Sequence, residues 1–306
     1  MNATRRALLK YSLVAGACAS PLAARVFAQS SKPTVVREGL SVIDAGGTNV
    51  VVRETTEGLV LVDSGTPDFA GALLDQLRSI GSGRVHTLFN THWHLDQCGA
   101  NAELGASGTN IVAHQKTWHH LATRIYLPHE ERFFEPLPKQ GLPTMKFSRP
   151  GSLDIGGETI DYGPLVQPHT DADIYVYFRN ANVLAVGGAV APPEIDPELD
   201  WYGGGWIGGR AQSMDTLMEI GDDSTLIVPA VGRVLTKAEL SAERDAMHEL
   251  YLRLNKLIRS GCSAECMEQE GALEGLGRTW HDPQRFLYAA YKGLWAHHYN
   301  LAPDIL

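Results

Sequence analysis

Cysteine is scarce in this chain, with four residues in 306, and Cys18 lies in an N-terminal segment that we interpret as a targeting signal. So few cysteines do not make a disulfide scaffold, and the fold must therefore depend on a hydrophobic core. Cys262 and Cys266 are four residues apart, which leaves open either a disulfide in an oxidising compartment or two free thiols. Cys98 is expected to be a small, half-buried filler.

Long apolar runs and an excess of positive charge are also missing. No stretch approaches the roughly 20 apolar residues of a membrane-spanning helix, so we expect no membrane span. The 26 Lys and Arg residues are outnumbered by 35 Asp and Glu residues, for a formal net charge of −9. This balance disfavours nucleic acid as a partner. The expected partner is a small-molecule substrate. The sequence does not indicate whether the protein is a monomer or an oligomer.

The first 28 residues have the pattern of a twin-arginine export signal. Arg5 and Arg6 precede a moderately apolar run over residues 11–24, and residues 26–28 (Val-Phe-Ala) offer a cleavage site. We therefore expect a signal peptide at 1–28 and a mature protein that works in the periplasm or outside the cell. An ordinary amphipathic helix is one alternative, and a lipidated cysteine at Cys18 is another.

Residues 29–306 alternate β-branched runs with helical patterns, which suits one α/β domain. The run of three valines within residues 49–53 is typical of a strand, and with its neighbouring runs it suggests an antiparallel meander. The segment 115–143 is aromatic and interrupted by prolines, and we interpret it as a cover over a site. From about 236 to 306 the chain is predicted to be helical, beginning with a capping box at Thr236.

The most informative feature is the segment 90–97, which reads Asn-Thr-His-Trp-His-Leu-Asp-Gln. It follows a predicted buried strand at 85–89. His92, His94 and Asp96 stand at alternating positions, which would place their side chains on one side of an extended segment. Imidazole and carboxylate groups are common ligands of transition metals, so the pattern predicts a metal site.

This motif resembles the signature of the metallo-β-lactamase-fold superfamily, which is His-x-His-x-Asp-His followed by later His, Asp and His ligands. The resemblance implies an α/β fold, an αββα sandwich of two mixed β-sheets flanked by helices. It covers most of the mature chain and rests on these segments: Leu61 to Gly65, Asn90 to Asp96, Ala113 with His114, His169 to Asp173, and Leu226 to Val234.

The resemblance implies that the first metal site of the family is intact. His92, His94 and His169 would hold one metal ion and leave a fourth tetrahedral position open, as in catalytic zinc sites. One Zn²⁺ is the expected cofactor, and iron is the alternative, since imidazole and carboxylate also suit iron.

The second metal site of the family is depleted. Of its usual groups only Asp96 remains, as a weak remnant. Gln97 stands where a histidine is expected, Gly188 where a bridging aspartate is expected, and Val231 where the last histidine is expected. We therefore predict a single-metal site in which Asp96 is free to act as the catalytic residue.

Other polar and aromatic residues near the motifs have less specific interpretations. Asp63 and Asp173 either orient the imidazoles or are turn and capping residues. A second ion would require replacement carboxylates, for which Asp171 and Asp196 are the candidates.

Three further histidines, His114, His119 and His120, are expected to have no ligand role. Trp93 and Trp206 are interpreted as pocket, lid or core residues.

The resemblance implies an exported metal-dependent hydrolase in which a zinc-bound hydroxide attacks an ester, lactone, thioester or lactam. Asp96 would orient the nucleophile and later pass a proton to the leaving group. Two alternatives stay open. One is a degenerate member that binds a metal or small ligand without turnover, and the other is an iron-dependent oxidoreductase.

Overall fold

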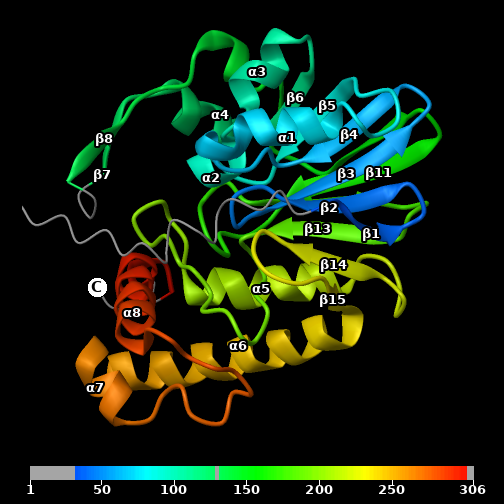
Figure 1. Cartoon of the computed structure of the whole chain (residues 1–306). Helices are drawn as coiled ribbons and strands as arrows, with labels where there is room; N and C mark the ends of the chain where they lie inside the picture. Colours follow the sequence, from blue (N-terminus) through cyan, green and yellow to red (C-terminus); the bar gives the residue numbers. More distant parts are fainter. Residues whose placement is uncertain (1–31, 128–130, 302–306) are drawn as a thin grey trace, which may run out of the picture. The chain divides into compact units, whose positions relative to one another are not determined.

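The structure is a computed structural model that describes residues 32–127 and 131–301 (Figure 1). The predicted signal peptide lies outside these residues. Among the described helices, none combines the length and apolar character that crossing a bilayer requires.

A seven-stranded mixed sheet is built from the first half of the chain, in the order β1-β2-β3-β4-β5-β6-β9. Its first four strands form an antiparallel meander, and the strands from β4 to β9 pair in parallel. Parallel neighbours need crossovers, which helices supply. The strands are β1 (Thr34–Arg37), β2 (Leu40–Asp44), β3 (Asn49–Thr55), β4 (Gly58–Val62), β5 (Val85–Asn90), β6 (Asn110–His114) and β9 (Met145–Phe147).

A six-stranded sheet follows, in the order β10-β11-β12-β13-β14-β15. All its pairs are antiparallel except β13 with β14. Every residue of β13 is buried, as expected of a central strand covered on both faces. The strands are β10 (Gly151–Ile155), β11 (Glu158–Pro164), β12 (Ile174–Phe178), β13 (Val183–Gly187), β14 (Leu226–Pro229) and β15 (Leu235–Thr236).

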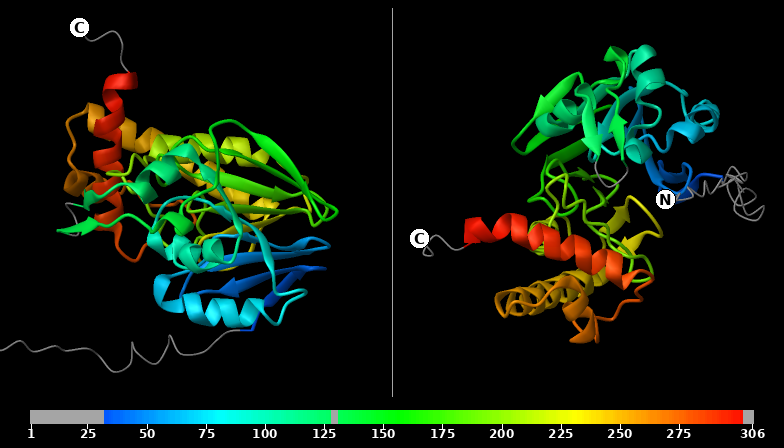
Figure 2. Two further views of the ribbon diagram at one scale, coloured as in Figure 1. Left: turned by 90° about the horizontal axis from the view of Figure 1, so that it is seen from above. Right: turned by 90° about the vertical axis from the view of Figure 1, so that its left-hand side faces the viewer.

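The helices lie on the outer faces of the two sheets (Figures 1 and 2). Two short 3₁₀ turns, η2 (Pro67–Phe69) and η3 (Lys139–Gly141), accompany them. The capping box predicted at Thr236 is present, because Thr236 and Glu239 exchange side-chain to backbone hydrogen bonds at the start of α6. The helices are α1 (Ala70–Leu77), α2 (Leu95–Cys98), α3 (Asn101–Ala106), α4 (Gln115–Ala122), α5 (Ile207–Met218), α6 (Lys237–Arg259), α7 (Ala264–Gln269) and α8 (Pro283–Leu301).

Three buried clusters hold these layers together. Phe89 and Val176 belong to the cluster between the two sheets, so the sheets pack face to face. Leu73 of α1 packs with Leu88 on the outer face of the first sheet. The third and largest cluster, which includes Leu250, places α5, α6 and α8 against the second sheet. The αββα sandwich implied by the resemblance is therefore confirmed.

The two cysteine predictions have different outcomes. Cys262 and Cys266, left open above, form a disulfide. Cys98 is fully buried rather than half-buried, and its thiol donates a hydrogen bond to the carbonyl oxygen of His92.

The segment 115–143, interpreted above as a cover, consists of α4, a hairpin of β7 (Ile125–Leu127) and β8 (Arg132–Phe134), and η3. Arg132 and Phe134 of the hairpin line a pocket beside His94. The hairpin therefore forms one wall of the candidate site.

Candidate metal centre

The two histidines of the motif follow the carboxyl end of β5, where loops of an α/β scaffold usually carry the chemistry. Strand β5 ends at Asn90, the backbone bends over residues 91–93, and α2 begins at Leu95. The expectation of one continuous extended segment was therefore wrong, and Asp96 lies on a single helical turn. The loop is anchored below by Asn90, whose side-chain amide exchanges hydrogen bonds with that of Asn101.

His92, His94 and His169 converge in the structure. The centroids of their rings are 4.6 to 4.8 Å apart, and each pair of rings is nearly perpendicular. One ligand atom from each ring lies within 4.8 Å of the other two. Among the described residues, these three make the group of histidine, cysteine or carboxylate side chains that is close enough to hold one ion.

Asp63 and Thr91 orient the imidazole of His92. The backbone N–H and hydroxyl of Thr91 both donate to Asp63, each at 2.7 Å. Nδ1 of His92 lies 3.0 Å from the Thr91 hydroxyl oxygen, so Nε2 is the nitrogen left for an ion. Burial, followed by the neighbouring His169 and His94, holds the pKa of His92 well below its usual value. The ring is therefore neutral, as a ligand must be.

Two further aspartates engage the other rings. Nε2 of His94 lies 3.1 Å from Oδ2 of Asp200, whose Oδ1 accepts the backbone N–H of Gly203 at 2.8 Å. Nδ1 of His169 lies 3.5 Å from Oδ1 of Asp173. The nitrogens left for an ion are thus Nδ1 of His94 and Nε2 of His169. Carboxylates that fix the far nitrogen of a ligand imidazole are typical of metal sites.

The donor set fits a Zn²⁺ ion. Both ring nitrogens of His169 are buried without a hydrogen-bond partner, and a cation would satisfy Nε2. Burial lowers the pKa of His169, but Asp173, Glu198 and Asp200 together raise it above its ordinary value. This environment stabilises positive charge, which a metal ion can supply in place of a proton.

The positions of the family's second site do not converge in the same way. Oδ2 of Asp96 accepts a hydrogen bond from Nε2 of Gln97 at 3.0 Å. A Cβ added to Gly188 would stand 2.3 Å from Nδ1 of His169, so no side chain fits there. Val231 is 39% exposed and lines a small pocket. Gln97 therefore holds Asp96, Gly188 leaves room for the ring of His169, and Val231 offers only an apolar side chain.

The two carboxylates considered as replacements have partners outside the three histidines, although Asp196 also lines a small pocket with His92 and His169. Asp171 binds His120 at 3.0 Å and Lys116 at 3.2 Å. Asp196 accepts the backbone N–H groups of residues 281 and 282.

The remaining aromatic and histidine candidates divide between the site and the core. Trp93 lines the pocket and stacks on His120, with ring centroids 4.7 Å apart. Trp206 instead packs in the helical core, where it stacks on His297. His114 is buried and caps α4, and His119 is exposed at the end of the same helix.

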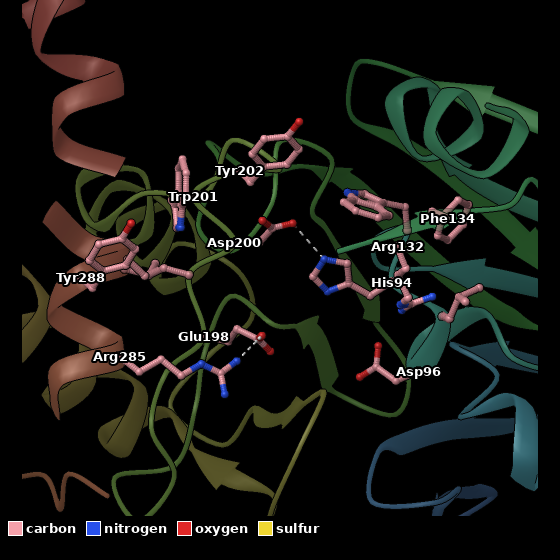
Figure 3. Close-up of a pocket in the computed structure, with 14 residues that line it drawn as sticks. His94, Asp96, Arg132, Phe134, Glu198, Asp200, Trp201, Tyr202, Arg285 and Tyr288 are labelled. Atoms are coloured by element: carbon pink, nitrogen blue, oxygen red, sulfur yellow. Dashed lines mark hydrogen bonds and ion pairs between the residues drawn. The ribbon is translucent and has the colours of Figure 1, made fainter. Parts of the chain in front are cut away.

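A pocket of about 490 Å³ opens beside His94 (Figure 3). Arg285 and Tyr288 of α8 face it from one side, and the β7-β8 hairpin faces it from the other. Arg285 lies 3.4 Å from Glu198, and Asp200 points to His94. Its lining residues are Trp93, His94, Leu95, Asp96, Arg132, Phe134, Glu198, Leu199, Asp200, Trp201, Tyr202, Arg285, Tyr288 and Ala289.

Sequence reasoning missed the group that joins the site loops. Arg210 of α5 is fully buried, and its Nη1 donates to the carbonyl oxygens of Gly188 at 3.0 Å, Glu198 at 3.2 Å and Pro168 at 3.5 Å. It therefore fixes three segments, one of which carries His169. The available signal was an arginine set among glycine, isoleucine and alanine on the buried face of a predicted helix. Asp200 gave no comparable signal.

Comparison with known proteins agrees with this geometry. The model of the metallo-beta-lactamase superfamily matches residues 43–230, more than half of the chain. Comparison by sequence with curated proteins gives no match.

Solved structures with this fold include a metallo-beta-lactamase from Pontibacter korlensis, with 18% identity, a TM-score of 0.58 and coverage of 72% of this chain and 99% of that one. A stereoselective inverting sec-alkylsulfatase from Pseudomonas sp. has 15% identity and a TM-score of 0.64. The match covers 88% of this chain but only 50% of the sulfatase.

A metallo-beta-lactamase from Cronobacter sakazakii, described by a HARLDQ motif, has 16% identity and a TM-score of 0.53, with coverage of 91% and 97%. The corresponding letters here are HWHLDQ, at residues 92–97. The family model, the fold and the three convergent histidines agree, and the chain belongs to the metallo-beta-lactamase superfamily.

Proposed function

We propose that this protein is an exported hydrolase that uses one zinc ion to cleave an ester, lactone, thioester or lactam. The observation that carries the proposal is the set of three convergent imidazoles, two buried and one half-buried. Each has one nitrogen near an oxygen atom of Thr91, Asp200 or Asp173, which leaves the other nitrogen for a shared ion. A Zn²⁺ ion bound there would supply a Lewis acid and lower the pKa of a bound water to about 7.

Asp96 is the chain's own acid–base group in this proposal. Its Oδ2 is held by Gln97, which leaves Oδ1 to accept a proton from the reacting water and later donate it to the leaving group. Asp96 also lines the two pockets that border the histidines. It therefore lies where substrate would enter from either side.

Two further observations support the substrate class and the export. The Cronobacter sakazakii lactamase motif shares His, Leu, Asp and Gln with residues 92–97, which favours keeping lactams in the set. The paired arginines at positions 5 and 6 support export by the twin-arginine route. Replacing both with lysine should retain the protein in the cytoplasmic fraction, and an unchanged distribution would contradict that route.

The first experiment measures the metal. Elemental analysis of the purified protein should find one zinc per chain, and His94→Ala should lose most of it. His119→Ala is the matched control, because His119 is an exposed histidine outside the triad of His92, His94 and His169. Full metal content in His94→Ala would refute the ligand set, and iron in place of zinc would favour the oxidoreductase alternative.

The second experiment measures turnover. Zinc-loaded protein should hydrolyse at least one member of a panel of esters, lactones, thioesters, lactams and phosphodiesters. Asp96→Asn should lower kcat by about 100-fold or more while zinc is retained. A protein that binds zinc but turns over none of the panel is instead a metal-binding member of the family.

A further inference from the structure

A second, smaller pocket borders the three histidines. It has a volume of about 150 Å³, and His92, His169 and Asp96 contribute to its lining. Gln97, Asp196 and Glu198 also line it, and the rest of its wall is aliphatic and comes from the loop after β13 and from the turn after β14. These aliphatic residues are Val190, Ala191, Ile195, Ala230 and Val231.

This pocket adjoins the positions where the family resemblance places second-site ligands. Gly188 and Val231 both line it, and neither offers a ligating side chain. Gln97 lines it as well and is held against Asp96. The replacements have left a space next to the reacting groups, and one side of its wall is aliphatic.

The wall of the pocket is held in place from behind. Arg278 is buried, pairs with Glu243 of α6, and donates to the carbonyl oxygens of Ala191 at 3.2 Å, Pro192 at 3.0 Å and Ile195 at 2.6 Å. A loop that had merely lost its metal ligands would be free to collapse onto the gap, since interiors close-pack where they can. The Arg278 contacts hold this loop away from the histidines.

The size and chemistry of the space define its occupant. An apolar cavity of about 150 Å³ holds a group the size of benzene, so a chain of about three to five carbons fits. Each buried methylene is worth about 0.8 kcal/mol, or about fourfold in binding. Asp96 and Glu198 line both this pocket and the 490 Å³ pocket, so the reacting atoms lie between the two.

We infer that the small pocket binds the acyl chain of the substrate, and this inference rests on the hydrolase function proposed above. The substrate class is then an ester or thioester of a short or branched aliphatic acid, with its leaving group in the larger pocket. Water oxygen bonds to the acyl carbon, the bond from that carbon to the leaving oxygen or sulfur breaks, and the leaving group takes a proton from Asp96. The products are the aliphatic acid and an alcohol or thiol.

The test uses 4-nitrophenyl esters from acetate to octanoate with the zinc-loaded protein. We expect kcat/KM to rise about fourfold per methylene up to butanoate or pentanoate and to fall by at least tenfold at octanoate. Val231→Ala should move the optimum to longer chains, and Ala191→Leu should move it to acetate. Val35→Ala makes the same change at an exposed valine on β1 and should leave the profile unaltered.

A binding measurement separates this inference from the hydrolase proposal. Calorimetric titration of the zinc-loaded protein with acetate, butanoate and octanoate should show the same optimum and the same shift in Val231→Ala, even if no ester is cleaved. Ester cleavage with no dependence on acyl length, or with a dependence on the alcohol portion alone, would overturn the acyl pocket and leave the hydrolase intact. Absence of both cleavage and chain-dependent binding would overturn the pocket as well.

Discussion

Gly188 offers the sharpest test of how this site differs from a two-metal centre. By analogy with the family, Gly188→Asp restores a bridging carboxylate and should help to recruit a second ion. The structure predicts the opposite. A Cβ at this position would stand 2.3 Å from Nδ1 of His169 and 2.7 Å from Cγ, whereas real Cβ contacts essentially never fall below 3.0 Å.

The size of the effect follows from this overlap. The His169 ring must move by about 1 Å to reach ordinary van der Waals distance, and it is buried, with only 3% of the residue exposed. Overpacking of this kind costs about 1–3 kcal/mol of stability. Because Nε2 of His169 moves with the ring, we expect the affinity for zinc to fall by about 100-fold or more, beyond the roughly 10- to 100-fold typical of losing an outer-shell partner.

The assay compares Gly188→Asp with Gly188→Ala, which adds the Cβ without the carboxylate. Zinc affinity is measured by competition with a chromogenic chelator, and stability by urea unfolding. Gly71→Ala is the control, because a Cβ there meets nothing within 4 Å. Two zinc ions bound to Gly188→Asp, or wild-type affinity in Gly188→Ala, would show that His169 is not confined as described.

Three further predictions concern the groups around the triad. Asp200→Asn weakens the acceptor for Nε2 of His94 and should lower zinc affinity about tenfold, measured by chelator competition; unchanged affinity would remove Asp200 from the site. Arg210→Met removes the donor shared by three loop carbonyls and should lower zinc affinity about 10- to 100-fold, and a purely structural role predicts lower stability with full affinity. Burial, opposed by hydrogen bonds from Thr91, raises the pKa of Asp63 to about 8 in the metal-free protein. Between the unfolded and folded pKa values, the folded state keeps the Asp63 proton that the unfolded state has lost. The free energy of unfolding should therefore fall by about 3 kcal/mol from pH 5 to pH 8. Urea unfolding in EDTA measures this fall, which should be smaller in Asp63→Asn.

The sequence predicted the parts of this protein that local pattern determines. Alternation of imidazoles after an aliphatic strand is visible within eight residues, and the superfamily signature then implied the fold, which the family model and the two packed sheets confirm. The convergence of His169 with the pair at 92 and 94 came from the same signature. The ligand and catalytic roles of these residues stay predictions until metal and turnover are measured.

The sequence could not predict contacts that only the tertiary fold creates. Asp200 lies 106 residues after His94, in a glycine-rich loop with no periodic pattern. The local sequence therefore does not predict which imidazole accepts or donates a hydrogen bond with Asp200. Arg210 has the same difficulty, since a buried guanidinium is recognised by the carbonyl groups around it. The error over Asp96 has a local cause: a four-residue helical turn is too short to leave a period.

The three replacements at the second site are linked by the space they share. With Gly188 closed to any side chain by the His169 ring, a histidine returned at position 97 or 231 would lack the bridging carboxylate of the family, and its ring would fill part of the small pocket. Two of the carboxylates that line this pocket already have other partners, since Asp196 accepts two backbone N–H groups and Glu198 pairs with Arg285. Restoring single family residues should therefore damage the acyl pocket before it rebuilds a metal site, which is why the alkyl chain of the substrate, rather than a second cation, is the occupant that this geometry favours.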